Sequence, residues 1–155
     1  MVKTQTDHAF VSLVERIEPR LAVALAAGYG PEVGREATRD ALAYAWEHWA
    51  KVRAMENPAG YLFRVGQSKA RRYLRRGVSF PPVPSPELPH VEPGLPAALD
   101  SLTSAQRVAV VLIHAEGYSD REAAELMGIR RGTARKHSER AMAKLRTALE
   151  VTADD

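Results

Sequence analysis

A proline-rich stretch divides this chain into two parts. Residues 77–96 hold seven of the ten prolines in the 155-residue sequence. Because proline lacks a backbone N–H and fixes its own φ angle, this stretch cannot form a regular helix. It predicts an extended, semi-rigid linker. The chain is therefore expected to fold as two small domains, residues 6–76 and 97–150, joined by the linker 77–96.

The first half is predicted to form three helices. The first spans about 6–27, where apolar side chains recur at three- and four-residue steps: Phe10, Leu13, Val14, Ile17, Leu21 and Leu25. Pro19 should kink or split this helix, which should end at Gly28, Gly30 and Pro31. A second helix is expected over 31–53. The third should start at an Asn57 cap followed by Pro58 and run to about Arg76.

The second half predicts a short helix over 96–102 and then two helices that open with capping boxes. These boxes are Thr103 with Gln106 and Ser119 with Glu122. No strand alternation of useful length appears, so the predicted fold class is all-α, with two small helical domains. A short capped helix, a turn at Gly128 and a longer basic helix over 130–150 are typical of a helix-turn-helix, which places its second helix in the DNA major groove. An ordinary helical hairpin with a charged exterior is the alternative.

The distribution of charge is more informative than its sum, which is only +3. Residues 64–76 carry six Lys or Arg and no acid, and residues 130–146 carry seven and one acid, Glu139. The segment 77–100 between them has three acids and no Lys or Arg. With Tyr61, Phe63 and Tyr73, the first basic patch could bind single-stranded DNA by charge and base stacking. It could equally be the solvated face of a packed helix.

Composition argues against several other classes of protein. The chain has no cysteine, which excludes disulfides and thiolate sites, and no apolar run approaches the roughly 18 residues of a membrane span. The start of the chain lacks the apolar core of a signal peptide, so a cytoplasmic location is expected. The five histidines are scattered, and Glu47-His48 lacks the second histidine of a zinc-protease helix. We expect no enzyme activity, no catalytic residue, no metal site and no cofactor.

Two segments resemble known regions of one family. Residues 99–149 resemble the fourth region of sigma-70-family factors of the extracytoplasmic-function (ECF) type. The matching features are Leu102-Thr103, Gln106-Arg107, Glu116 to Ser119, Glu122 to Glu125, Gly128-Ile129, Gly132-Thr133, Arg140-Ala141 and Leu145-Arg146. Residues 10–76 are similar, more weakly, to the second region of the same family. The features there are Ala41-Leu42, Ala45-Trp46, Trp49, Asn57-Pro58, Tyr61-Leu62 and Leu74 to Arg76.

The resemblance implies a promoter-recognition subunit whose partners are core RNA polymerase and promoter DNA, with an anti-sigma protein as a further candidate partner and no membrane. It implies that the core-polymerase-binding residues are Glu36, Arg39, Asp40 and Tyr44. It implies that the residues that bind the melted minus-ten strand are Tyr61, Gln67, Ser68, Lys69, Arg71 and Arg72. It implies that the residues that bind the minus-thirty-five duplex are Arg130, Arg131, Thr133, Arg135, Lys136 and Arg140.

Several positions depart from the family pattern. Arg39 replaces a usual glutamine, and Ser68 and Arg72 replace a usual asparagine and aspartate on the minus-ten helix. Arg130 replaces a usual capping serine. Inside the recognition helix, Ala134 and Ser138 replace a usual valine and leucine, which should loosen its packing. These changes keep open a second hypothesis, a sigma-like helix-turn-helix regulator that does not initiate transcription.

Overall fold

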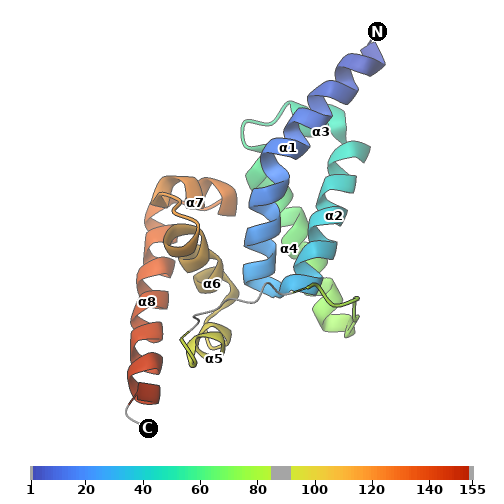
Figure 1. The fold of residues 1–155 in the computed structure, drawn as a ribbon. Coiled ribbons are helices and arrows are strands. Elements are labelled where there is room, and N and C mark those ends of the chain that lie inside the picture. The colour runs from blue at the N-terminus through green and yellow to red at the C-terminus, as the bar shows by residue number, and fades with distance from the viewer. Residues whose placement is uncertain (1, 85–91, 154–155) are drawn as a thin grey trace.

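A computed structural model, which describes residues 2–84 and 92–153, contains only helices and loops in those two ranges. The predicted all-α fold class is confirmed. The N-terminal half holds α1 (Val2–Tyr29), α2 (Pro31–Glu47), α3 (Trp49–Arg53) and α4 (Pro58–Arg76). The C-terminal half holds α5 (Leu95–Asp100), α6 (Ser104–Val110), a π-helical turn (Val111–Ala115), α7 (Asp120–Met127) and α8 (Arg131–Ala153). Figure 1 shows the two halves side by side, with α8 at the outer edge.

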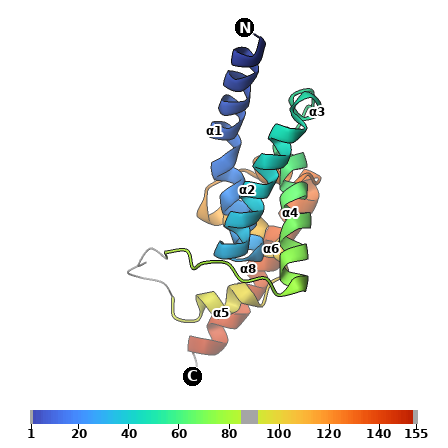
Figure 2. The same ribbon diagram turned by 90° about the vertical axis from the view of Figure 1, so that its right-hand side faces the viewer.

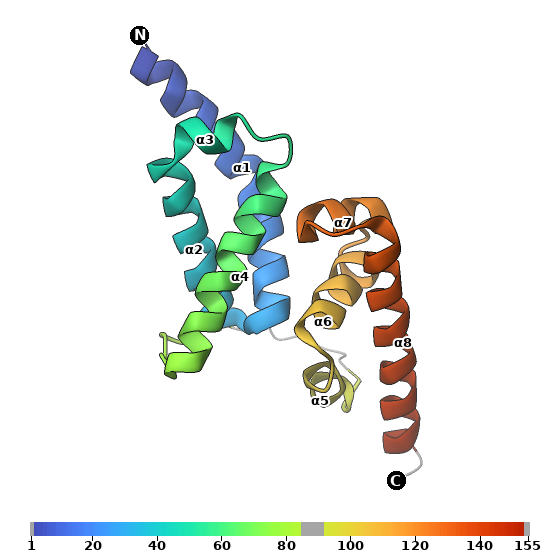
Figure 3. The ribbon, with the colours of Figure 1, turned by 180° about the vertical axis from the view of Figure 1, so that it is seen from behind.

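Helices α1, α2 and α4 pack together to form the N-terminal half (Figure 3). The predicted stripe of α1 is its packing face, because Leu13, Ile17, Leu21 and Leu25 are all buried. The helix is not split at Pro19, which lies inside the single helix α1 with its side chain exposed. The prediction of one helix over 31–53 is wrong, since α2 and α3 are separate elements. The break falls at His48, whose φ of −116° and ψ of 33° lie outside the helical range.

The C-terminal half follows the predicted caps closely. Both capping boxes are present, with Thr103 accepting from the Gln106 N–H and Ser119 accepting from the Glu122 N–H. The bond from the Ser119 N–H to the Glu122 carboxylate also lowers the pKa of Glu122. Gly128 ends α7 at a φ of +65°, which glycine adopts without steric cost. The helix predicted to open at the Thr103 capping box is α-helical only to Val110, and the π-helical turn continues it to Ala115.

The buried apolar residues form two clusters. The smaller one lies within the C-terminal half and consists of Ala98, Leu102, Val110, Ala141 and Leu145. The larger one joins the two halves, because the same cluster holds Leu21, Leu25 and Phe63 from the first half and Leu112 and Leu126 from the second. The main core of the molecule therefore crosses the predicted domain boundary.

The described residues include no helix that is long and apolar enough to cross a membrane. Nor do they include a group of three or more His, Asp or Glu side chains that could hold a metal ion.

Helices α1 and α2 approach each other closely at Gly34. A Cβ at this position would lie 2.5 Å from the backbone nitrogen of Ala26. We expect Gly34→Ala to lower the free energy of unfolding by about 1–3 kcal/mol, because two helix backbones would have to separate. Chemical denaturation monitored by circular dichroism measures this change. The matched control is Gly132→Ala, where the added Cβ meets nothing within 4 Å. A Gly34→Ala protein as stable as the control would contradict the prediction.

Candidate nucleic-acid interface

The turn between α7 and α8 sets the direction of the longest helix in the C-terminal half. Gly128 reverses the chain, and the Arg130 carbonyl then accepts the first backbone hydrogen bonds of α8, from Thr133 and Ala134. One side of α8 is buried through Ala134 and Ala141. Ser138 is also buried, and its hydroxyl lies 3.1 Å from Nε2 of His114. The polar residue at this position thus has a polar partner, which compensates for part of the apolar packing that a leucine would give.

The opposite side of α8 and the preceding turn are basic. Arg135 is engaged within the helix, since its Nε lies 3.2 Å from a carboxylate oxygen of Glu139 in an exposed pair. Among the described residues, no acid pairs with the other basic side chains of this face. All six residues predicted to contact the minus-thirty-five duplex are exposed: Arg130, Arg131, Thr133, Arg135, Lys136 and Arg140. A row of exposed cations on a helix that follows a tight turn suits a major groove lined by phosphates.

Helix α4 carries the residues predicted to bind the minus-ten strand, but on two adjoining faces. Gln67, Ser68 and Arg71 line a cleft of 590 Å³, whereas Tyr61, Lys69 and Arg72 do not. The far wall of the cleft belongs to the C-terminal half and is formed by Ala105, Met127, Ile129 and His137. Arg64 and Arg75 of α4 add two further cations to the cleft. The sequence did not predict that this face of α4 looks toward the helix-turn-helix.

An aromatic cluster joins the start of α4 to the end of α2. The hydroxyl oxygens of Tyr44 and Tyr61 lie 3.0 Å apart, and Lys51 Nζ donates to the Tyr61 hydroxyl at 3.1 Å. The Tyr44 ring stacks on the His48 imidazole, with centroids 4.1 Å apart. The bond between the hydroxyls raises the pKa of Tyr44 and lowers that of Tyr61, and the Lys51 ammonium lowers the latter further. One predicted polymerase contact and one predicted DNA contact therefore share a single cluster.

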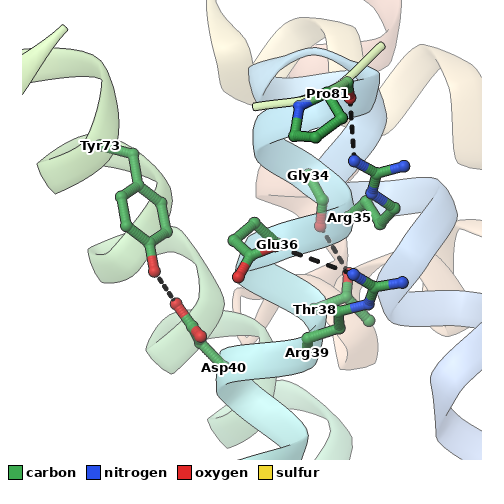
Figure 4. Close-up of polar contacts among 8 residues, drawn as sticks. All are labelled: Gly34, Arg35, Glu36, Thr38, Arg39, Asp40, Tyr73 and Pro81. Atoms are coloured by element: carbon green, nitrogen blue, oxygen red, sulfur yellow. Dashed lines mark hydrogen bonds and ion pairs between the residues drawn. The ribbon is translucent and has the colours of Figure 1, made fainter. Parts of the chain in front are cut away.

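The other three predicted polymerase contacts lie on α2 (Figure 4). Arg39 pairs with Glu36 at 3.9 Å on the surface, one turn apart. Asp40 accepts a hydrogen bond from the Tyr73 hydroxyl of α4. This bond, together with partial burial, raises the pKa of Tyr73 to about 12. Asp40 is therefore partly exposed and also joins α2 to α4 through this hydrogen bond.

The described beginning of the linker is attached to the same region. The Arg35 guanidinium donates to the Pro81 carbonyl at 2.9 Å (Figure 4), and the Val83 N–H donates to Glu32 at 3.3 Å. Phe80 packs edge-on against the Tyr73 ring, with centroids 4.9 Å apart. Figure 2 shows this segment passing the ends of α1 and α2. The linker therefore begins next to the predicted polymerase-binding residues.

Removing the Asp40 carboxylate should lower the pKa of Tyr73. We expect Asp40→Ala to bring the pKa of Tyr73 down from about 12 toward its ordinary value of 10, because the hydrogen bond that holds the phenol proton is lost. The pKa of Tyr73 is higher in the folded than in the unfolded chain. The hydrogen bond therefore stabilises the fold fully below pH 10, and this contribution disappears as the pH rises from 10 to about 12. Tyrosinate absorbance measures the titration. Tyr73→Phe identifies the signal among the five tyrosines, and an unchanged high-pH step in Asp40→Ala would refute the assignment.

Comparisons with known proteins agree with this geometry. Residues 94–145, which include α5, the capped helices, the turn and most of α8, match the family model described as sigma-70, region 4. The match covers about a third of the 155-residue chain, so it shows that the C-terminal part is similar to sigma-70 region 4. The predicted resemblance of residues 99–149 to the fourth region is confirmed. No curated protein sequence matches the chain.

One solved structure extends the likeness beyond region 4. It is the sigma factor RpoE from Bartonella quintana, in a co-crystal with the anti-sigma factor NepR. The alignment has a TM-score of 0.64 at 22% identity and covers 92% of this chain and 98% of the other. At this level of identity the likeness concerns the fold, and it supports a sigma-like arrangement of helices in both halves.

Sequence reasoning missed the residues that join the two halves. Asn57, Arg64 and Arg107 each donate to a backbone carbonyl in the opposite half. Asn57 was recognised only as the α4 cap, and Arg107 only as part of the family pattern. A local sequence pattern could not have revealed these bonds, because the partners lie 64 to 80 residues away.

Proposed function

We propose that this protein is a sigma factor of the ECF type, which binds core RNA polymerase and directs promoter recognition and the start of transcription. The observation that carries the proposal is the exposed basic face of α8, set by the Gly128 turn within a matched region 4 domain. Such a helix can read base edges through arginine and bind phosphates through both Arg and Lys. In this role α8 binds the minus-thirty-five element as duplex.

The N-terminal half is proposed to bind the polymerase and the melted minus-ten strand. The pair of partly buried Glu36 and exposed Arg39, together with the aromatic cluster around Tyr44 and Tyr61, offers a mixed polar and aromatic surface for a protein partner. The basic face of α4 offers cations for the phosphates of a single strand, and Tyr61 offers a ring for stacking. The departures at Arg39, Ser68 and Arg72 then alter the specificity of these contacts.

We further propose the functional division into residues 6–76, the linker 77–96 and residues 97–150, with polymerase and minus-ten contacts in the first unit and minus-thirty-five contacts in the last. The protein would act in the cytoplasm, together with the polymerase. An anti-sigma protein is a candidate regulatory partner. The solved sigma factor with the similar fold is bound to one.

The test is reconstitution with bacterial core RNA polymerase. The purified full chain should be retained by immobilised core polymerase and should start run-off transcripts on the DNA upstream of its own gene or on a library of genomic fragments. Core polymerase alone and a chain carrying Arg131→Glu and Lys136→Glu are the controls. Retention without any transcript on any fragment would contradict the proposal.

A sigma-like DNA-binding regulator that does not initiate transcription is the second candidate. The departures at Arg39, Ser68 and Arg72 favour it. It predicts duplex binding through α8 without retention by core polymerase, so the same experiment separates the two functions.

A further inference from the structure

The cleft between α4 and the helix-turn-helix carries an excess of positive charge. Helix α7 lies beside α4 at this place (Figure 3). Three arginines of α4 line the cleft, namely Arg64, Arg71 and Arg75, and His137 of α8 lies on the opposite wall. No Asp or Glu is among the lining residues. An anion in the cleft therefore meets positive charge that no lining carboxylate neutralises, and walls of low dielectric strengthen that field.

Other clefts of the described residues have a different charge balance. Three of them also contain arginine, but the lining of each includes a carboxylate, from Asp100, Glu56 or Glu18. A fourth is lined by one cation, Lys144, and by small residues. The convergence of several cations without an acid is therefore a property of the α4 cleft and not of clefts in this protein generally.

The guanidinium groups of this cleft have donors to spare. Those of Arg71 and Arg75 make no hydrogen bond or ion pair with any other described residue. Arg64 is held at the turn, because its Nη2 donates to the Gly128 carbonyl. A guanidinium has five N–H donors, so Arg64 keeps others for a ligand while its position is fixed.

The polar residues of the cleft follow one stripe of α4. Arg64, Gln67, Ser68, Arg71 and Arg75 succeed one another at steps of one, three or four residues. Arg71 and Arg75 are one helical turn apart, about 6 Å along the axis. Like charges at this spacing repel each other, and a bound polyanion removes the repulsion. Since a guanidinium binds phosphate oxygens in pairs, two of them one turn apart suit a chain of linked phosphates.

The remaining lining adds features that inorganic phosphate does not need. It is apolar and consists of Phe63, Ala105, Met127 and Ile129. An apolar wall packs against the flat face of an aromatic ring, and the Gln67 amide and Ser68 hydroxyl can bond to polar ring edges or to a sugar. The cleft volume of 590 Å³ lies within the range of about 300–1,000 Å³ that is typical of sites for single small molecules.

We propose that this cleft is a binding site for a nucleotide that carries a chain of two or more phosphates. The phosphates bind Arg71 and Arg75, and the base packs against Met127 and Ile129 of the opposite wall. The site does not depend on the proposed sigma function, because nucleotide binding requires neither polymerase nor promoter. Gln67, Ser68 and Arg71, which are predicted to bind the minus-ten strand, then serve two ligands, and a bound nucleotide competes with single-stranded DNA for them.

Isothermal titration calorimetry of the full chain with ATP, GTP, CTP and UTP tests the proposal. At least one triphosphate should bind with one-to-one stoichiometry, and at about ten times its Kd it should raise the melting temperature by about 3–6 °C. The matching nucleoside and tripolyphosphate should each bind at least about tenfold more weakly, because each lacks one part of the ligand. Since no carboxylate lines the cleft to hold Mg²⁺, chelation of Mg²⁺ should not weaken binding.

Two neighbouring arginines provide a matched pair of variants. Arg75 lines the cleft and Arg76 does not, although both are exposed residues of the last turn of α4. Arg75→Ala should raise the Kd of the triphosphate at least about tenfold, because charge-assisted bonds to phosphate are lost. Arg76→Ala should leave the Kd within about twofold of the wild type. Equal effects of the two variants would mean that the nucleotide binds the basic surface of α4 at large, and would overturn the proposal.

Photochemical cross-linking locates the bound nucleotide. An azido analogue of the triphosphate that binds should label peptides from both walls, residues 63–75 of α4 and residues 127–137 of the helix-turn-helix. An excess of the unmodified triphosphate should suppress the labelling. Labelled peptides from other parts of the chain alone would place the nucleotide elsewhere and overturn the proposal.

Three further outcomes would also overturn the proposal. The first is that no triphosphate binds at concentrations up to about 1 mM, the upper end of the range in which enzymes commonly bind their substrates. The second is that tripolyphosphate binds as tightly as the triphosphate, which would mean a site for polyphosphate only. The third is that a short single-stranded oligonucleotide binds as tightly and with the same dependence on Arg75, which would make the cleft a part of the strand-binding surface.

Discussion

Leu62→Ala is expected to lower the free energy of unfolding by about 2–5 kcal/mol. Leu62 is fully buried in α4, within the cluster that joins the two halves. The substitution removes the free energy gained by transferring the leucine side chain from water to the core. It also leaves a cavity, which the surrounding helices can fill only in part because each is packed against several others. At about 2–4 °C per kcal/mol for a chain of this size, the melting temperature should fall by roughly 5–20 °C.

The control is the same substitution on the same helix. Leu74 is 53% exposed, so Leu74→Ala should change the free energy of unfolding by no more than about 0.5 kcal/mol. Urea denaturation of the two variants compares burial alone, since the residue type and the change are identical. Equal destabilisation by both variants would mean that α4 is not packed as the structure has it.

Arg131→Ala is expected to weaken binding to the minus-thirty-five duplex by about 1–3 kcal/mol, a rise in Kd of about 5- to 150-fold. Arg131 is the first residue of α8, is exposed, and follows directly on the turn. In a helix-turn-helix the N-terminal residues of the recognition helix contact base edges. Unlike Arg135, whose guanidinium is held by Glu139, Arg131 has no ion-pair partner among the described residues.

Fluorescence anisotropy with a duplex from a promoter found by run-off transcription measures this loss. Scrambled duplex separates base reading from phosphate binding: a contact to phosphate alone weakens binding to both sequences and lowers the salt dependence by about one ion. Arg146→Ala, the same change at an exposed position near the other end of α8, should have little effect. A loss that is equal for Arg131→Ala and Arg146→Ala would remove Arg131 from the recognition face.

Local chemistry made much of this fold predictable. The caps at Asn57, Thr103 and Ser119 depend on bonds to residues three positions away, so the sequence alone specifies them. The same holds for Gly128, whose left-handed conformation ends α7. The resemblance to region 4 was visible partly for the same reason, because its pattern includes the Thr103 and Ser119 caps and the Gly128 turn.

The candidate site was predicted in part. The six residues predicted on α8 are all exposed, on the side of the helix away from buried Ala134 and Ala141. The division of α4 into two faces did not follow, because it depends on which neighbour covers Gln67 and Ser68. The bond between Tyr44 and Tyr61 joins α2 to α4 and assigns to one cluster two residues that the sequence had placed on different surfaces.

By itself, the sequence determined the helical class, most helix ends, the proline-rich linker and the basic face of α8. Each of these depends on backbone geometry or on bonds within about four residues. Only the tertiary structure decided the break at His48, the docking of Pro81 on Arg35 and the closure of the two halves through Arg107. The last two join groups 46 and 80 residues apart, where chain entropy permits many pairings and the packing of a shared apolar core selects one.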